Sequence, residues 1–431
     1  MMLTRTLVLA GVMVVFGPSG LALAQPIIDY VNAPDDSFAW EVERAETLGT
    51  VEVTHLKLTS QTWRDVVWTH RVQLLVPESR PHPETAVMLI VGGSPDETQL
   101  RSHASAAVAV SAPLVILGDI PNQPLFGGRT EDALIALTFS NYLESGEADW
   151  PLLFPMTKAA VRAMDALEEY TAAEWERPIS SWVVTGGSKR GWTTWFTGAV
   201  VPERLRGIIP VAYDNLNLPE QMRLHITAWG EYSAMIQPYT ERGLPDLLTA
   251  EEGQALAAMV DPYTLRDRID IPQLTITGTN DAYWPLDAAN LYWDDLNGAN
   301  SILYVPNSGH DISDERLYAA QAGFFKACTG RGELPNPTWE FDETDGLRIV
   351  VDPGETLPLL RVTQWRAHSP TRDFRPAEWT QAPAAEEGGR YIAQIGTPEE
   401  GFSAIFAEIV YELDGRPFPL STNVRIIKAR E

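Results

Sequence analysis

Hydrophobic and polar positions alternate along the chain from about Val51 to Val76, in "VEVTHLKLTSQTW" and "VVWTHRVQLLVPE". A period of two residues predicts half-buried antiparallel strands. The pattern then changes to the continuous apolar runs "AVMLIVGGS" and "APLVILGDIP". Runs of this kind, ending in glycine, predict strands that are buried on both faces.

Helical patterns separate the buried strands. "QLRSHASAAVAVS" is compatible with a helix, and "FPMTKAAVRAMDALEEYTAA" has the apolar spacing of a clear amphipathic helix. The further predicted strands are "SWVVTGG", "LRGIIPVAYD", "IPQLTITGTND" and "ANSILYVPNSGH". Apolar strands that alternate with helices predict an α/β fold with a mostly parallel sheet covered on both faces. Functional side chains in such folds gather at the carboxyl ends of the strands.

Two regions interrupt this alternation. Residues 215–268 form a long insertion rich in Trp, Tyr and Met, which predicts a mainly helical lid over the strand ends. After "LPNPTWEF", short alternating segments with Pro, Gly and Thr predict a C-terminal β-sandwich. The expected organisation is therefore an α/β domain over residues 25–333, containing the lid, followed by the sandwich over residues 334–431.

The amino terminus has the features of a secretory signal peptide. Arg5 supplies a positive region, "LVLAGVMVVFG" is the apolar region, and "ALA" is a small-residue cleavage site. A membrane anchor is the alternative, but the apolar run is short and is interrupted by Gly and Pro. We therefore expect residues 1–24 to be removed after Ala24, giving a secreted or periplasmic protein without a membrane anchor.

The charge of the chain restricts its partners. A net charge of −26 argues against nucleic acid and anionic membranes as partners. The lone cysteine, Cys328, cannot form an internal disulfide, and its sequence context predicts a buried helical position. The sequence has no metal-binding motif and no phosphate-binding loop, so we expect neither a metal nor a cofactor. The oligomeric state does not follow from the sequence.

Three residues carry the predicted chemistry. Ser188, Asp281 and His310 each follow a predicted strand, in the order nucleophile, acid, histidine that is typical of α/β-hydrolases. In such a triad the histidine removes the serine proton and the carboxylate fixes the histidine tautomer. Each residue also has a structural interpretation: a helix N-cap, an Asx-turn and a core histidine, respectively. Asp214, at the end of "IIPVAYD", is the rival acid.

The segment around Ser188 departs from the common G-x-S-x-G pattern, because Arg190 occupies the position of the second glycine. The small residue follows one position later, as Gly191. The backbone amide of Lys189 is the first candidate donor for an oxyanion hole. The second donor is predicted in the loop after "MLIVGGS", at Gly92, Gly93 or Ser94, although glycine there can also serve close backbone packing alone.

Aromatic and cationic residues near these positions suggest how substrate is bound. Trp192, Trp229 and Trp284 are candidates for stacking on sugars or aromatic esters, and the alternative for each is packing in the core. Lys189 and Arg190 place two cations beside Ser188. They either recognise an anionic group or oxyanion, or form structural ion pairs with nearby carboxylates, which is favoured for Arg190.

Long blocks of the chain resemble the PhoPQ-activated pathogenicity-related protein family. The resemblance rests on "GGSKRGWTTW", "ITGTNDAYWPLDAA", "VPNSGHDI", "PNQPLFGGRTEDALIA", "WPLLFPMTKAAVRAMDAL", "WRAHSPTRDFRPAEW" and "FPLSTNVRI". It implies an exported α/β-hydrolase with a β-sandwich at its carboxyl end, and it implies that Ser188, Asp281 and His310 match the family's triad. Because the family also includes a secreted growth-repressing factor, the resemblance does not by itself imply catalysis.

A looser similarity concerns the segment after Ser188. Ser-x-x-Gly with a basic residue directly after the serine is similar to glucuronoyl esterases, in which an arginine at that position helps to stabilise the oxyanion. By analogy, the ammonium group of Lys189 would do the same work here.

The sequence therefore predicts an exported serine hydrolase that cleaves a small-molecule or carbohydrate ester through an acyl-enzyme. A secreted peptidase with the same triad is the alternative enzyme. A non-catalytic signalling or binding protein on a hydrolase scaffold is the alternative of a different class.

Overall fold

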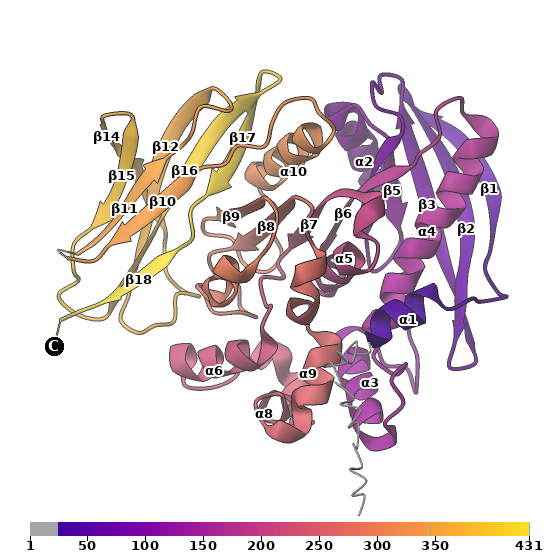
Figure 1. Ribbon diagram of the computed structural model, residues 1–431, viewed down its shortest axis with the longest axis horizontal. Coiled ribbons are helices and arrows are strands. Elements are labelled where there is room, and N and C mark those ends of the chain that lie inside the picture. Colours follow the sequence, from indigo (N-terminus) through magenta and orange to yellow (C-terminus); the bar gives the residue numbers. More distant parts are fainter. Residues whose placement is uncertain (1–24, 345, 431) are drawn as a thin grey trace, which may run out of the picture.

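A computed structural model describes residues 25–344 and 346–430 (Figure 1). The predicted signal peptide lies outside the described residues. One large mixed sheet runs through the molecule in the order β1-β2-β3-β5-β4-β6-β7-β8-β9-β17-β16-β12-β13. Its first nine strands are β1 (Ala39–Leu48), β2 (Val51–Trp63), β3 (Val66–Pro77), β4 (Thr85–Ile90), β5 (Leu114–Leu117), β6 (Ser181–Gly187), β7 (Leu205–Val211), β8 (Gln273–Gly278) and β9 (Asn300–Val305).

The two predicted kinds of strand are both present. β1, β2 and β3 pair antiparallel, and the inward residues of β2 alternate with outward ones along most of its length. From β5 to β9 neighbouring strands pair parallel, and β5 and β8 are buried throughout. This difference follows from burial, because only a strand covered on both faces is apolar at consecutive positions.

Helices cover both faces of the parallel strands. α1, α4 and α5 pack together on one face, while α2 and α10 pack together on the other. The helices outside the lid are α1 (Pro26–Asn32), α2 (Glu97–Val110), α3 (Glu131–Ser145), α4 (Leu153–Glu174), α5 (Lys189–Val200) and α10 (Glu315–Cys328). Cys328 ends α10 and is half-buried. No helix in the described part of the chain is long and apolar enough to span a membrane.

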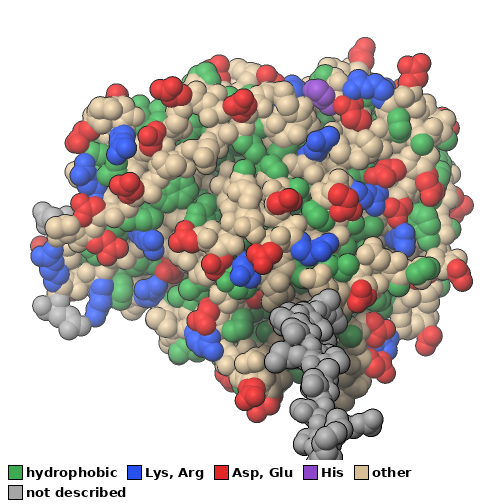
Figure 2. Space-filling model, in the orientation of Figure 1, with side chains coloured by type: hydrophobic (Ala, Val, Ile, Leu, Met, Phe, Trp, Pro, Cys, Tyr) green, Lys and Arg blue, Asp and Glu red, His purple; other side chains and the backbone are tan. Residues whose placement is uncertain are grey.

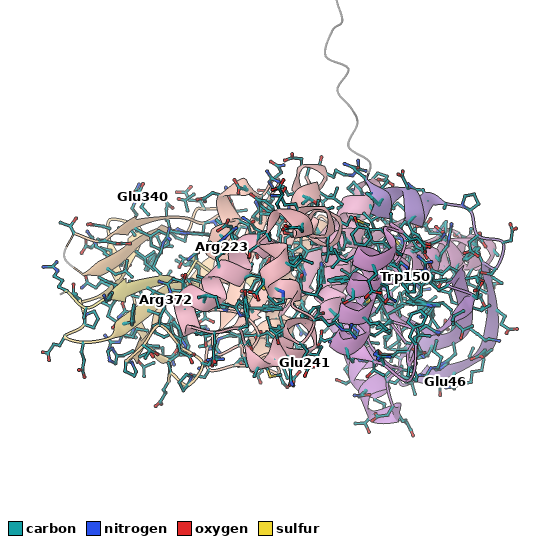
Figure 3. The ribbon with its side chains drawn as sticks, turned by 90° about the horizontal axis from the view of Figure 1, so that it is seen from below. Glu46, Trp150, Arg223, Glu241, Glu340 and Arg372 are labelled. Carbon is teal, nitrogen blue, oxygen red and sulfur yellow. The ribbon has the colours of Figure 1, made fainter. Side chains whose placement is uncertain are left out.

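The insertion between β7 and β8 is helical, and Figure 1 shows it below the central strands. It contains α6 (Leu218–Trp229), η2 (Ala234–Ile236), α7 (Gln237–Thr240), α8 (Leu244–Leu248), η3 (Glu251–Gly253), α9 (Gln254–Val260) and η4 (Pro262–Arg268). Seen from below, this lid lies between the N-terminal and C-terminal strands, with Arg223 and Glu241 on its outer surface (Figure 3).

The C-terminal strands form two packed layers. One layer is a separate sheet of β10 (Thr338–Asp342), β11 (Leu347–Asp352), β15 (Arg390–Ile395) and β14 (Ala385–Glu387). The other contains β12 (Leu359–Ser369), β13 (Thr380–Pro383), β16 (Phe402–Leu413), β17 (Arg416–Ser421) and β18 (Arg425–Lys428). This second layer continues the large mixed sheet, because β17 pairs antiparallel with β9. The division of the chain at residue 334 stays a prediction.

The connection from β8 to β9 contains η5 (Ala288–Leu291) and η6 (Trp293–Asp295). In the described chain, α10 is the one helix between β9 and β10. η1 (Pro202–Arg204) completes the short helices. Carboxylates outnumber cations over the face in Figure 2, in keeping with the net charge of −26.

Candidate active site

Ser188 lies on a sharp turn between β6 and α5. Its backbone has φ 56° and ψ −125°, a left-handed conformation that is uncommon for a residue with a side chain. Ser188 precedes α5, but its hydroxyl does not cap that helix. The turn therefore directs the hydroxyl away from the helix amides, as a strand–turn–helix nucleophile requires.

Two glycines explain why Arg190 is tolerated next to this turn. A Cβ on Gly191 would lie 2.9 Å from both the Cβ of Tyr213 and the carbonyl oxygen of Val211, so α5 crosses β7 closely there. A Cβ on Gly92 would lie 2.2 Å from Nη2 of Arg190. A side chain at position 92 would therefore clash with Arg190, because its guanidinium occupies the space beside the loop after β4.

Ser188, His310 and Asp281 form a continuous hydrogen-bonded chain. Nε2 of His310 lies 2.8 Å from Oγ of Ser188, and Nδ1 lies 2.8 Å from Oδ2 of Asp281. The carboxylate accepts the Nδ1 proton, which leaves Nε2 to accept the Ser188 hydroxyl proton. The ring of Tyr283 stacks on the imidazole at a centroid distance of 4.0 Å. Asp281 also forms the predicted turn, because its Oδ1 accepts the Tyr283 amide at 2.7 Å.

Asp214 does not take this position. Its side chain forms no hydrogen bond or ion pair with His310 in the described structure, and its Oδ1 is buried without a partner. Burial raises the pKa of Asp214 to about 7, and the charge of nearby Asp281 acts in the same direction. The geometry therefore places Asp281, and not the rival acid, against the histidine.

The buried Asp214 predicts a pH-dependent effect on stability. Its pKa is above the ordinary value of 3.8 in the folded protein, so ionisation favours the unfolded chain increasingly between pH 3.8 and about 7. Asp214→Asn removes this cost. We expect the melting temperature of the variant, relative to wild type, to rise across that interval and to level off above pH 7. Asp36→Asn, at an exposed carboxylate, is the control. A difference that does not change with pH would contradict the prediction.

Two asparagines fix the loops that carry the acid and the histidine. Nδ2 of Asn280 donates to the carbonyl oxygens of Phe374, Arg375 and Ala377 at 3.3, 3.0 and 2.7 Å. Asn307 donates to the carbonyl of Trp379 at 3.0 Å and accepts its amide at 2.7 Å. The segment between β12 and β13 therefore supports both loops.

This support predicts an effect on turnover. Asn280→Ala removes these three hydrogen bonds and the one that Oδ1 of Asn280 accepts from the Thr279 hydroxyl, without touching the hydrogen-bonded chain itself. We expect kcat for an ester to fall about 10-fold or more with little change in KM, because misorientation of the acid reduces positioning of the histidine. Asn297→Ala, at an exposed asparagine, is the control. An unchanged kcat in a folded Asn280→Ala variant would contradict the supporting role.

Both cations after Ser188 are paired with Glu131, the first residue of α3. Arg190 donates to both carboxylate oxygens at 2.7 Å, and Nζ of Lys189 lies 2.9 Å from Oε2. Lys189 also lies 3.4 Å from Asp132. Burial acts to raise the pKa of Glu131, but the hydrogen bonds and charges of Arg190 and Lys189 outweigh it and hold this pKa at about 2. This arrangement agrees with the prediction that Arg190 forms a structural ion pair with a nearby carboxylate.

An apolar cavity opens at Ser188 beneath the lid. It is lined by Asp132, Phe139, Ser188, Lys189, Trp192, Tyr213, Asn215, Leu218, Met222, Ile236, Tyr239, Leu244, Pro245, Leu248, Tyr283 and Trp284. The space within it that admits the centre of a water molecule is only about 50 Å³. The cavity therefore fits a small apolar group beside the Ser188 hydroxyl.

The predicted binding residues differ in their placement. Trp192 and Trp284 line this cavity, and the indole of Trp192 donates to the carbonyl of Val260 at 2.7 Å. Trp229 does not line it. Its ring contacts His225 at a centroid distance of 5.0 Å, and the guanidinium of Arg375 lies 4.0 Å above it. The structure thus places Trp229 against His225 and Arg375, neither of which lines the cavity.

The predicted oxyanion donors are also separated. Lys189 is the first residue of α5, where backbone amides lack an intrahelical acceptor, and it lines the cavity. Gly93 and Ser94 do not line this cavity. Ser94 instead lines a different one, together with Glu43, His55 and Arg71. The role of Gly93 and Ser94 as donors stays a prediction that this arrangement does not support.

Sequence reasoning missed several residues of the site. Glu131, Asn280 and Asn307 were not predicted to contribute, although all three lie in the blocks that carry the family resemblance. Their type alone gave no signal, because isolated Glu and Asn residues are common in turns and at helix starts. No group of three metal-binding side chains that would hold an ion is found in the described structure.

Comparison with known proteins agrees with the architecture. The family model for the PhoPQ-activated pathogenicity-related proteins matches residues 27–375. The chain belongs to this family. One relative is autocrine proliferation repressor protein A of Dictyostelium discoideum. It is 30% identical to this chain, and the alignment covers 90% of this chain and 86% of the relative. The matched residues span the α/β domain, the lid and the strands β10 to β12.

A solved structure confirms the predicted fold class for this member of the PhoPQ-activated pathogenicity-related family. The acetyl xylan esterase of Paenibacillus sp. R4 is similar with a TM-score of 0.51 and 15% identity, covering 70% of this chain and 92% of that chain. Acetyl xylan esterase 1 of Thermoanaerobacterium sp. JW/SL YS485 has a TM-score of 0.49 and 14% identity, with 70% and 90% covered. At such identity the likeness establishes the α/β-hydrolase fold alone.

Proposed function

We propose that this protein is an exported serine hydrolase that cleaves carboxylic esters through an acyl-enzyme. The observation that carries the proposal is the hydrogen-bonded chain from Ser188 through His310 to Asp281, with 2.8 Å at each step. Distances of this size permit proton transfer without rearrangement. The acid side chain is 3% exposed and the histidine 15%, so the relay is shielded while the serine faces the cavity.

The residues divide the reaction as follows. His310 accepts the hydroxyl proton as Oγ of Ser188 bonds to the ester carbonyl carbon, and Asp281 stabilises the imidazolium. The backbone amide of Lys189 donates to the oxyanion of the tetrahedral intermediate. The imidazolium then protonates the leaving alcohol, and the acyl group stays on Ser188. Water, deprotonated by His310, attacks the acyl-enzyme and releases the acid with the serine hydroxyl restored.

The ammonium group of Lys189 is not proposed as an oxyanion ligand. It already lies within 2.9 Å of Glu131 and 3.4 Å of Asp132, so its charge is compensated. We propose that it instead orders the first turn of α5 and thereby the amide beside Ser188. The proposed role of the Lys189 ammonium group therefore differs from the one that the looser similarity to glucuronoyl esterases suggested.

The narrow cavity favours short acyl groups. Its lining is mainly apolar and its free space is small, so a long acyl chain or an extended polypeptide requires movement of the lid. This favours an ester over the alternative peptide substrate. The acetyl xylan esterase of Paenibacillus that shares the fold is named for an acetylated polysaccharide, which makes acetylated sugars a reasonable first substrate class to test.

Labelling of the nucleophile tests the proposal directly. A fluorophosphonate probe is expected to modify the folded protein at one residue, Ser188, identified by peptide mass spectrometry. An ester panel would then include acetyl and butyryl p-nitrophenyl esters, acetylated sugars and uronate esters, with casein for the peptidase alternative. Absence of labelling together with absence of ester turnover would favour the non-catalytic binding protein and would overturn the proposal.

The size of one lid side chain, Met222, is expected to set the acyl-chain preference. Met222 on α6 lines the cavity and is 4% exposed, so Met222→Ala enlarges the acyl site. We expect the ratio of kcat/KM for butyryl over acetyl esters to rise about 10-fold, since a methylene is worth 1–3 kcal/mol in an apolar pocket. Met235→Ala, at an exposed lid methionine outside the cavity, should leave the ratio unchanged. An unchanged ratio in Met222→Ala would contradict this location for the acyl group.

Export is part of the same proposal. We propose that residues 1–24 are a signal peptide removed after Ala24, so that the mature chain starts at Gln25. Expression with the native leader followed by amino-terminal sequencing of the periplasmic or medium fraction tests this. Retention of residues 1–24 in the isolated protein would exclude cleavage.

A further inference from the structure

A second cavity lies between the hydrolase body and the C-terminal strands. It is lined by Asn290, Trp293, Asp294, Pro337, Thr338, Trp339, Phe341, Asn423 and Arg425. These residues come from η5, η6, β10 and the segment around the start of β18. The space that admits the centre of a water molecule is about 370 Å³, compared with about 50 Å³ at Ser188. The second cavity therefore has room for a ring-sized ligand.

Aromatic rings form one side of this cavity. Trp339 and Phe341 lie on the same face of β10, because side chains alternate along a strand and Glu340 between them is exposed on the other face (Figure 3). The ring of Trp293 lies 6.1 Å from that of Trp339 at an angle of 38°. All three aromatic side chains are only half-buried. Half-buried aromatic faces of this kind provide apolar contact area at low cost in side-chain entropy.

Fixed polar groups line the same cavity. Asn423 is 4% exposed, and its Nδ2 donates to Oδ1 of Asn290 at 2.9 Å. Asn290 is itself fixed by donating to the carbonyl of Val424 at 2.9 Å. Oδ1 of Asn423, however, is buried without a hydrogen-bond partner. A buried amide oxygen without a donor is costly, so this atom marks a position where a ligand donor would be stabilised.

Charged groups complete the lining. The guanidinium carbon of Arg425 lies 4.3 Å from the centre of the Phe341 ring, which orients the group, while its Nε has no partner. Within the described structure, Arg425 forms no ion pair with a carboxylate inside 4 Å. Asp294 stands exposed among the cavity residues. The site thus combines amide, carboxylate and guanidinium groups with aromatic faces.

We propose that this cavity binds a sugar residue of a glycan. A pyranose ring has an apolar face for Trp339 or Trp293 and hydroxyl groups for Asn423, Asp294 and Arg425. A purely apolar ligand would leave Oδ1 of Asn423 unsatisfied, so a hydroxyl-bearing ring fits the lining better. This binding site is separate from the chemistry at Ser188 and does not depend on the proposed ester hydrolysis.

Binding is tested in the full chain carrying Ser188→Ala, so that no turnover can occur. Titration calorimetry with xylo-oligosaccharides, gluco-oligosaccharides and oligogalacturonates covers neutral and acidic sugar rings. We expect at least one of them to bind with a dissociation constant of about 1 mM or below. Binding of neutral oligosaccharides identifies hydroxyl recognition. Binding of oligogalacturonate alone, lost in Arg425→Gln, identifies a uronate ring.

Variants assign the binding to this cavity. Trp339→Ala and Asn423→Ala are expected to weaken it about 10-fold or more, equivalent to 1.4 kcal/mol. Trp175→Ala is the matched control, because Trp175 is also half-buried and has an arginine, Arg80, near its ring. Asp294→Ala, at an exposed position, provides a second variant that should fold even if the aromatic variant does not. Absence of binding by every oligosaccharide at about 10 mM, or unchanged affinity in all three cavity variants, would overturn the proposal.

Discussion

Replacing Ser188 by alanine is expected to reduce kcat for a short p-nitrophenyl ester about 10⁴-fold or more, with little change in KM. In the proposed mechanism the hydroxyl oxygen bonds to the substrate, and its one hydrogen bond in the described structure is the 2.8 Å contact with Nε2 of His310. His310→Ala should have a comparable effect. The double variant should be no worse than either single one, because residues that act as a unit lose their contribution together.

The chain contains a matched control for this experiment. Ser60 and His70 also form a serine–histidine pair, with Oγ 2.9 Å from Nε2, but they are buried between β2 and β3 without a carboxylate on the other imidazole nitrogen. Ser60→Ala should therefore leave ester hydrolysis unchanged. Retained turnover in a folded Ser188→Ala variant would refute the proposed mechanism, whereas a loss in Ser60→Ala would show that the assay reports folding.

The second large effect concerns Glu131. Glu131→Gln removes the carboxylate that pairs with Arg190 and Lys189, whose side chains are 11% and 8% exposed. We expect the free energy of unfolding to fall by about 2–4 kcal/mol, because a buried guanidinium without its partner is costly; the partial exposure of Glu131 keeps the value from being larger. Thermal unfolding monitored by circular dichroism measures this. Glu144→Gln, at an exposed position on the same helix, is the control.

The pH dependence of this loss has a defined sign. The pKa of Glu131 is lowered from 4.5 to about 2 in the folded protein, so its contribution is complete above about pH 4.5 and is lost as the pH falls towards 2. The difference in stability between wild type and Glu131→Gln should therefore shrink over that interval. A difference that stays constant down to pH 2 would show that the ion pairs do not cause the destabilisation.

Much of the site followed from strand patterns alone. Ser188, Asp281 and His310 were predicted to converge because each ends a buried strand, and parallel strands end at one edge of a sheet. The structure brings their side chains into hydrogen-bond contact. The helical lid also followed from the interruption of the alternation between β7 and β8. The catalytic role of Ser188, Asp281 and His310 stays a prediction.

What the sequence could not reveal depends on contacts between distant segments. Glu131 meets Arg190 across 59 residues of chain, and Asn280 meets the segment at 374–377 across more than 90. Periodicity describes which face of an element is buried, but it does not identify which loop lies against another. Trp229 illustrates the same limit, because an aromatic residue type predicts stacking on a ligand or packing in the core, but not that the ring lies against the guanidinium of Arg375.

The pairing of β17 with β9 has a consequence for how this protein can be divided. β9 is the last parallel strand, and Ser421 of β17 lies in register with Ile302 while its hydroxyl accepts the amide of Tyr304 at 3.1 Å. A shortened chain ending near residue 333 would present the unpaired backbone of β9 to solvent, and open edges of this kind recruit other strands. By pairing with β9, the sandwich strand β17 thus protects the edge of the α/β sheet from pairing with other chains. Fragments that lack the sandwich should be recovered mainly as aggregates.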